Sequence, residues 1–249
     1  MQILVHIGRP TCDYLSGVEQ KYSSLQGKRR PRSIWPGFNL ANIYGTLPIG
    51  KLTLVCGADE TVSAFLSWLA VRLAADSKLP VICAFNCQAE ELAGRLISVE
   101  SKVPLACLNA GTVKREDWVS LTRAAGVVAD SNISVAVESG TPLHLLAAQA
   151  GALGQKKRPS VLIVAGGAGG EPKKLHSLAR KHGIVAIMAA GTPIPAGTSA
   201  ALTLKVRSYN LGKNTKGIKV SALIDGNITN WEETYHEKNC VRVGIMPPR

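Results

Sequence analysis

Apolar residues along the chain follow two alternating patterns between residues 47 and 190. Short, nearly continuous apolar runs predict buried strands at 52–56, 80–85, 133–137, 158–164 and 184–189. Between these runs, apolar residues recur at helical spacing, which predicts helices at 62–76, 89–98, 142–153 and 172–182. Strands that are apolar on both faces and alternate with helices are typical of a mostly parallel sheet with helices on both sides. The pattern therefore predicts an α/β fold.

The two ends of the chain have patterns of their own. At 201–207, 218–224 and 240–243, apolar and polar residues alternate around turn residues such as Asp225 and Gly226, which predicts an antiparallel extension of the sheet. Near the other end, a basic run is followed by Pro36 and Gly37, which stop a helix. That run consists of Lys28, Arg29, Arg30 and Arg32. We therefore expect an N-terminal arm or linker at 1–33 and a single domain at 34–249.

Composition narrows the class of protein. The chain has 249 residues, of which 46% are hydrophobic and 5% aromatic, and this fits an α/β protein better than a β-sandwich. The six cysteines form no C-x-x-C pair, which indicates reduced cysteines in a cytosolic protein. The N-terminus lacks the features of a signal peptide, and the apolar runs are shorter than the ~20 residues that cross a bilayer. We expect a cytoplasmic protein with no membrane partner.

Net charge is the strongest signal in the composition. The formal charge is +12, which favours a polyanionic partner, with nucleic acid first and a membrane surface second. The histidines and cysteines have no metal-ligand spacing, and the acids are too scattered to form a paired-carboxylate site. The sequence therefore predicts no metal site and no catalytic carboxylate pair.

The stretch from Leu52 to Ala70 predicts a strand, a loop and a helix, which is where nucleotide-binding proteins place the phosphate-binding loop G-x-x-x-x-G-K-[ST]. Here the loop from Gly57 to Ser63 reads Gly-Ala-Asp-Glu-Thr-Val-Ser. It has one glycine, no lysine and the adjacent acids Asp59 and Glu60, which would repel a triphosphate. The sequence therefore has the strand–loop–helix arrangement of a phosphate-binding loop but lacks that loop's second glycine and lysine.

Three segments together resemble the RecA-like ATPase domain of DnaB-type replicative helicases. The segment at 35–55, from Trp-Pro-Gly-Phe to Leu-Thr-Leu-Val, resembles the lead-in to that family's first strand. The segment at 81–98, which contains Glu-Glu-Leu-Ala-Gly-Arg-Leu, resembles the next strand and its "E-Q-L-x-x-R-L" helix, and Asp117-Trp118 matches a downstream D-W. The resemblance spans about residues 34–225 and implies a RecA-like sheet sandwiched by helices.

The resemblance also identifies positions where that family's ATP chemistry is missing. With Ser63 at the family's threonine, the preceding lysine position is Val62. The water-activating glutamate corresponds to Asn86, and the aspartate after a later strand corresponds to Ala165. A basic finger near the end of the family's domain is reduced to the region of Lys213 and Lys216. We therefore expect a degenerate nucleotide site with no catalytic residues, no cofactor and no ATP hydrolysis.

By the same resemblance, loops after the later strands contact nucleic acid in the helicase family. Basic residues near these loops and on the terminal hairpin are therefore candidates for sequence-independent phosphate contacts, more with DNA than with RNA. They are Lys173, Lys174, Arg180, Lys181, Lys205, Arg207, Lys213, Lys216 and Lys219. The resemblance further implies a homo-oligomer or a subunit of a larger complex, with the basic arm as a docking segment.

Three functions stay open at this point. The first is an inactive DnaB-like subunit that binds nucleic acid or scaffolds a complex in replication, recombination or a mobile element. The second is an enzyme or sensor that binds a nucleotide or phosphate at the glycine-rich loop Gly166–Gly170, which follows a predicted strand and precedes a helix. The third is a structural assembly subunit that makes no contact with nucleic acid.

Overall fold

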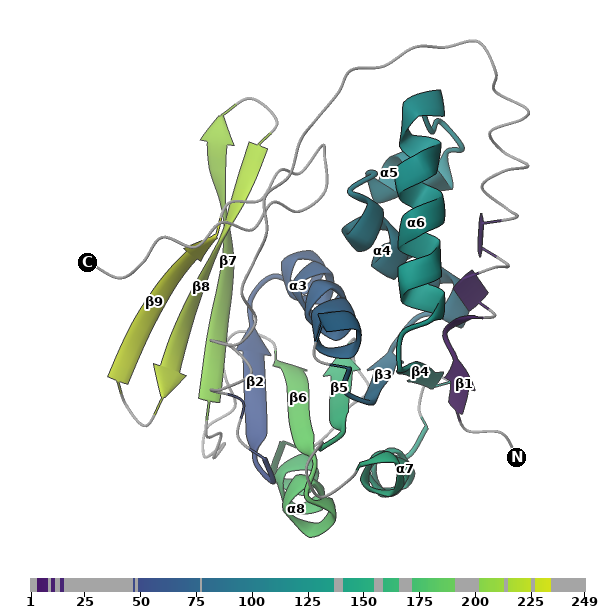
Figure 1. The fold of residues 1–249 in the computed structure, drawn as a ribbon. Helices are drawn as coiled ribbons and strands as arrows, with labels where there is room; N and C mark the ends of the chain where they lie inside the picture. Colours follow the sequence, from purple (N-terminus) through teal and green to yellow (C-terminus); the bar gives the residue numbers. More distant parts are fainter. Residues whose placement is uncertain are drawn as a thin grey trace.

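A nine-stranded mixed sheet lies at the centre of the part of the chain that the structure, a computed structural model, describes. The described residues are 4–8, 10–11, 14–15, 47, 49–76, 78–136, 141–154, 159–165, 172–190, 202–212, 215–224 and 227–233. The strands are β1 Leu4–His6, β2 Leu52–Cys56, β3 Val81–Phe85, β4 Ile133–Ala136, β5 Val161–Ala165, β6 Val185–Ala190, β7 Leu202–Gly212, β8 Thr215–Ile224 and β9 Asn227–Glu233. Their order in the sheet is β1-β4-β3-β5-β6-β2-β7-β8-β9 (Figure 1).

The inner strands, from β4 through β3, β5, β6 and β2 to β7, are all parallel to their neighbours. At one edge β1 pairs antiparallel with β4, and at the other edge β8 and β9 continue from β7 as antiparallel strands. The predicted α/β fold with a mostly parallel sheet is confirmed. The antiparallel strands differ in their bounds from the expected ones, and the strand expected at 240–243 lies outside the described residues.

Helices cover both faces of the sheet (Figure 1). On one face lie α3 Asp59–Val71 with a π-helical turn at Arg72–Asp76, α4 Ala89–Ser101, α5 Leu105–Asn109, the 3-10 helix η2 Arg115–Asp117 and α6 Trp118–Ala129. On the other face lie α7 Leu143–Leu153 and α8 Pro172–His182. Among the described residues, none of these helices is long and apolar enough to cross a membrane.

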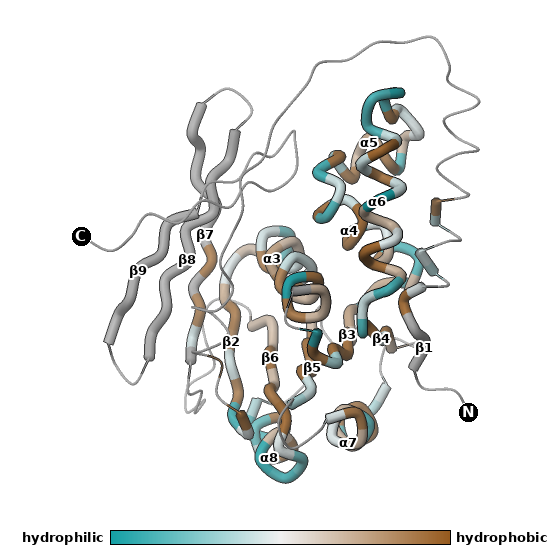
Figure 2. The backbone as a smooth tube through the Cα atoms, viewed as in Figure 1, coloured by the Kyte–Doolittle hydropathy of each residue, from teal (hydrophilic) through white to brown (hydrophobic). Residues whose placement is uncertain are grey.

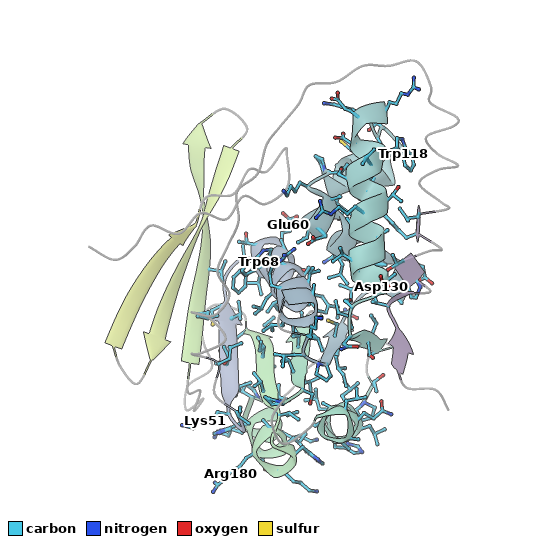
Figure 3. All side chains as sticks on the ribbon, viewed as in Figure 1. Lys51, Glu60, Trp68, Trp118, Asp130 and Arg180 are labelled. Atoms are coloured by element: carbon cyan, nitrogen blue, oxygen red, sulfur yellow. The ribbon has the colours of Figure 1, made fainter. Side chains whose placement is uncertain are left out.

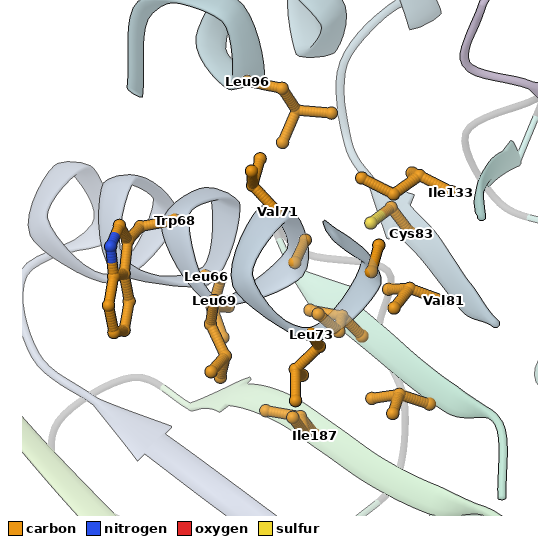
Figure 4. Close-up of a cluster of buried hydrophobic side chains, with 14 of the residues drawn as sticks. Leu66, Trp68, Leu69, Val71, Leu73, Val81, Cys83, Leu96, Ile133 and Ile187 are labelled. Carbon is orange, nitrogen blue, oxygen red and sulfur yellow. The ribbon is translucent and has the colours of Figure 1, made fainter. Parts of the chain in front are cut away.

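Alternate residues of the central strands feed two separate cores, because successive side chains of a strand point to opposite faces. Val55, Val81 and Cys83 pack with α3 and α4 in one core, and Figure 4 shows Cys83 beside Ile133 of β4. Leu54 and Ile82 pack with α7 and α8 in the other. Each fully buried side chain of this size contributes about 1.5–3 kcal/mol to stability. Burial on both faces explains why the strands are nearly continuous apolar runs.

The first residues of the chain contribute to the sheet and to the helical layer. The strand β1 forms one edge, and Ile7 is fully buried. Tyr14 packs its ring against Gly94 of α4, and its hydroxyl donates a hydrogen bond to Oδ1 of Asn109 at 3.0 Å. Burial raises the pKa of Tyr14 to about 12. Part of the range 1–33 therefore packs on the domain, while the basic run lies outside the described residues, so the division at residue 33 stays a prediction.

Candidate functional site

The junction between β2 and α3 is shorter than the sequence predicted. Only Gly57 and Ala58 separate the strand from the helix, which begins at Asp59. The N–H of Val62 donates to the carbonyl oxygen of Ala58 at 2.9 Å, so Val62 already lies within the helical hydrogen-bond pattern. The prediction of a loop over 57–63 is therefore wrong from Asp59 onward. The adjacent acids of the first turn explain this, since negative charge near a helix N-terminus favours the helix.

Val62, at the position of the family's lysine, is part of the hydrophobic core. Its side chain is 3% exposed and packs in the cluster that holds α3 against the sheet. Gly57 is equally constrained, because a Cβ at this position would overlap the carbonyl oxygen of Val206 in β7 and touch the Val62 side chain. A side chain at position 57 would therefore have no space between β7 and the Val62 side chain.

Ser63 is held by a side chain that the sequence analysis did not assign. Nη1 of Arg95, on α4, donates a hydrogen bond to the Ser63 hydroxyl, and Nη2 donates to Oε1 of Glu91 at 2.7 Å. The Arg95 side chain is 30% exposed and that of Glu91 is 52% exposed. A divalent cation at the Ser63 hydroxyl would face the guanidinium, and two like charges at hydrogen-bond distance repel each other. The arrangement therefore disfavours a metal ion at Ser63.

Asn86 and Ala165 lie next to each other at the ends of adjacent strands. The strands β3 and β5 pair in register with Phe85 opposite Ala165, and the Asn86 N–H donates to the Ala165 carbonyl oxygen at 3.2 Å. The sequence prediction that these two positions share one site is consistent with this contact. Neither residue carries a carboxylate, and no cluster of three metal-ligating side chains occurs within the part of the chain that the structure describes.

Cys87 follows Asn86 at the end of β3, and the charge of Arg95 acts on its thiol. Burial is the largest influence on the Cys87 thiol and raises its pKa. The positive charge of Arg95 lowers the pKa, and the negative charge of Glu91 raises it. Burial therefore favours the protonated thiol over the thiolate, which is the nucleophilic form of cysteine. Hydrogen bonds join Arg95 to Ser63 and to Glu91, and the charges of Arg95 and Glu91 both act on the Cys87 thiol.

Asp59 and Glu60 are exposed at the N-terminus of α3. Figure 3 shows Glu60 at the end of α3. Their charges occupy the helix end that would otherwise attract a phosphate. The repulsion of a triphosphate by these two acids stays a prediction.

The predicted nucleic-acid contacts on α8 form one exposed surface. Lys173, Lys174, Arg180 and Lys181 are all exposed, whereas Leu175 and Ala179 are fully buried against the sheet. Figure 2 shows α8 as largely hydrophilic beside the more hydrophobic α7. The outer face of α8 thus carries positive charge.

The other basic candidates are only partly described. Lys205 and Arg207 lie on β7, and Lys216 and Lys219 on β8, with Arg207 directly opposite Lys219 in the register. Lys213, the run from Lys28 to Arg32, and the loop Gly166–Gly170 lie outside the described residues.

Charge is divided between the two faces of the sheet. The described acids of the helices and their ends belong to elements on the α3–α6 side: Asp59, Glu60, Asp76, Glu90, Glu91, Glu100, Glu116, Asp117 and Asp130. On the α7–α8 side, residues 141–154 and 172–190 include no Asp or Glu, although Glu171 directly precedes α8 in the sequence. The α8 side of the molecule is therefore the positive side among the described residues, a division that sequence order alone did not reveal.

Comparison with known proteins identifies a family for the chain and solved structures with a similar fold. Residues 40–165 match the family described as DnaB-like helicase C terminal domain. Among solved structures, one described as an ATPase domain has a TM-score of 0.62 and 14% sequence identity, covering 94% of this chain and 98% of that chain. A second, of a DnaB-like replicative helicase and its interactions with primase, has a TM-score of 0.59 and 13% identity, covering 96% of this chain and 77% of that chain. At these identities the likeness shows the fold alone. No curated protein matches.

Proposed function

The chain belongs to the family of DnaB-like helicase C-terminal domains, and from that premise we propose that it has lost ATP hydrolysis and serves as a nucleic-acid-binding subunit of a larger assembly. One observation carries the first part of the proposal. The helix α3 begins at Asp59, so the segment that would wrap a phosphate is already helical, and Val62 is buried in the core.

The other parts of the site support the same conclusion. A phosphate-binding loop works because successive backbone N–H groups face the phosphates and a lysine reaches them. Here Val62 uses its N–H within the helix, and the Ser63 hydroxyl accepts from Arg95. Asn86 has an amide in place of a carboxylate and cannot take a proton from an attacking water. These features act on different steps of hydrolysis, so one substitution would not restore turnover.

The charge of α8 supports the nucleic-acid part of the proposal. Lys173 and Lys174 lie in the first turn of α8, where the helix dipole disfavours positive charge by about 0.3–1 kcal/mol per residue. Residues that cost stability in the free protein are expected where they contact a ligand. Phosphates bound by lysine and arginine in this way give an affinity that depends strongly on salt and little on base sequence.

Membership of the family supports an assembly role. We propose a homo-oligomer or a subunit of a nucleoprotein complex in replication, recombination or a mobile element, with the run from Lys28 to Arg32 as a docking segment. Size-exclusion chromatography with light scattering, with and without DNA, tests this role. A monomer under both conditions that recruits no partner contradicts it.

Two assays on the full chain test the proposal. ATP hydrolysis and binding of a fluorescent ATP analogue are measured with and without single-stranded DNA, and we expect neither. Turnover that Ser63→Ala abolishes would contradict the loss of ATPase activity. Fluorescence anisotropy with labelled DNA of mixed sequence is expected to show binding that weakens as salt increases, and no binding at low salt would refute the nucleic-acid role.

A further inference from the structure

Lys51 lies beside the C-terminal end of α8, although the two are far apart in the sequence. Gly50 has a positive φ of +70°, and a Cβ on Gly50 would lie 3.6 Å from Cα of Arg180. The Gly50 N–H donates to the carbonyl oxygen of Ile184 at 2.9 Å, and this bond holds residue 50 next to the segment that follows α8. Lys51, the next residue, is exposed, and Figure 3 shows it at the same end of the molecule as Arg180.

Five cations therefore share one surface, which we call the basic ridge. Its members are Lys51, Lys173, Lys174, Arg180 and Lys181. Lys173 and Arg180 are seven residues apart, as are Lys174 and Lys181, so each pair lies in line along α8 at a separation of about 10 Å. The ridge thus presents two parallel rows of charge on one convex face, and Lys51 extends them beyond the end of the helix.

The cations of the ridge have no carboxylate among residues 141–154 and 172–190 to neutralise them. The two at the C-terminus of α8 stabilise the helix through its dipole, which is an ordinary structural role. That role does not account for Lys173 and Lys174 at the opposite end, or for Lys51, which is not on the helix. A line of negative charge along the ridge would remove the mutual repulsion of all five.

We propose that the basic ridge binds the phosphate backbone of a nucleic-acid duplex. This inference rests on the proposed function and specifies both the form of nucleic acid and a residue, Lys51, that the sequence did not suggest. Along a duplex, each strand offers one phosphate per ~3.4 Å of axis, so the ~10 Å between the two members of each pair corresponds to about three phosphates. Lysine and arginine side chains on a convex helix contact such a backbone from outside.

The chemistry of the surface favours a duplex over a single strand. Proteins that bind single strands combine positive charge with aromatic side chains on which the bases stack. The described residues of α7, α8 and their flanks, 141–154 and 172–190, are aliphatic, small or charged, with histidine as their only ring besides proline. A surface of point charges recognises the regular backbone of a duplex, whose bases are already stacked.

The test measures how binding depends on salt, because each phosphate contact adds about 0.9 to the slope of log K against log salt for B-DNA. Anisotropy titrations use labelled duplex and single-stranded DNA of the same length and sequence. We expect Lys51→Gln to reduce the slope for duplex by about 0.9, and Arg180→Gln with Lys181→Gln by about 1.8. The matched control is Arg123→Gln, which removes one exposed charge from α6 on the other side of the sheet and should leave the slope unchanged.

The outcomes separate this inference from the proposed function. Tighter binding to single strand than to duplex, or an unchanged slope in Lys51→Gln, overturns the inference and leaves the nucleic-acid role intact. Binding to neither form refutes both. Vesicles containing anionic lipid serve as a third ligand, and binding to vesicles without binding to duplex also overturns the inference. Circular dichroism on each variant shows whether the fold is retained, and we expect it to be, since all substituted residues are exposed.

Discussion

The guanidinium of Arg95 and the hydroxyl of Ser63 form a direct hydrogen bond between α4 and α3. This bond connects the first turns of α3 to α4, the helix that follows β3. It also gives the Ser63 hydroxyl a protein partner, with Glu91 neutralising the other end of the same guanidinium. The two helices are therefore joined at the position where the family resemblance expects the end of a phosphate-binding loop.

A double-mutant cycle measures the strength of this bond. Ser63→Ala and Arg95→Gln are each expected to lower the free energy of unfolding, and their coupling energy should be about 0.5–1.5 kcal/mol, since the bond has one charged partner but is partly exposed. Urea denaturation of the two single variants and the double variant gives this value. Glu91→Gln is the control, because its exposed ion pair should contribute only about 0.3–0.5 kcal/mol. A coupling energy near zero between Ser63 and Arg95 would refute the bond.

Restoring the missing lysine should not restore ATP binding. In Val62→Lys a charged side chain replaces one that is 3% exposed, and we expect a loss of about 3 kcal/mol or more in the free energy of unfolding. Val119→Lys makes the same chemical change at a side chain that is 79% exposed and should alter stability by at most about 0.5 kcal/mol. Chemical denaturation and binding of an ATP analogue are the measurements. A stable Val62→Lys protein that binds ATP would show that the phosphate site is only one residue away from function.

Hydrophobic periodicity was enough to predict the sheet and most of its helices, because both faces of the strands are buried and leave continuous apolar runs. The apolar spacing and the resemblance to a phosphate-binding loop both place the start of the helix near Val62, whereas the acids Asp59 and Glu60 favour the earlier start that the structure has. Arg95 lies in the segment that resembles the family, and the sequence alone indicates no partner for it. Its contact with Ser63 joins two helices through space, and no local pattern shows that.

The basic ridge shows a similar limit. Lys173, Lys174, Arg180 and Lys181 could be selected from the sequence because they lie on one short helix. Lys51 could not, since its place beside α8 depends on the positive φ of Gly50 and on the order of strands in the sheet. The separation of the acids onto the α3–α6 side likewise follows from which helices cover which face.

Two glycines provide a matched test of packing around the turn between β2 and α3. Gly57→Ala places a methyl group against the backbone carbonyl of Val206, which cannot move without shifting β7. We expect a loss of about 1–3 kcal/mol in the free energy of unfolding. Gly126→Ala is the control: nothing lies within 4 Å of the added carbon, and alanine favours the exposed helix α6 by about 0.5–1 kcal/mol. Equal tolerance of both substitutions would mean that β7 does not pack on the turn after β2.

The reactivity of Cys87 reports the charges around it. Because burial raises the pKa of this thiol, its alkylation by iodoacetamide should be slow at neutral pH and increase as the pH rises above the usual range for cysteine. Glu91→Gln removes a negative charge, lowers the pKa and should speed alkylation at pH 8. Arg95→Gln removes the positive charge that lowers the pKa and should slow alkylation, whereas Arg95→Lys should largely preserve the wild-type rate.

Mass spectrometry of the peptide that contains Cys87 gives the rate at each pH, with the half-buried Cys107 in the same molecule as the internal reference. The ratio of the two rates corrects for general changes in stability or reagent concentration. Both substitutions could also change the exposure of the thiol, and the pH at half-maximal rate separates the two effects, since access changes the height of the profile and charge changes its midpoint. Identical midpoints in Glu91→Gln and Arg95→Gln would show that neither charge acts on Cys87.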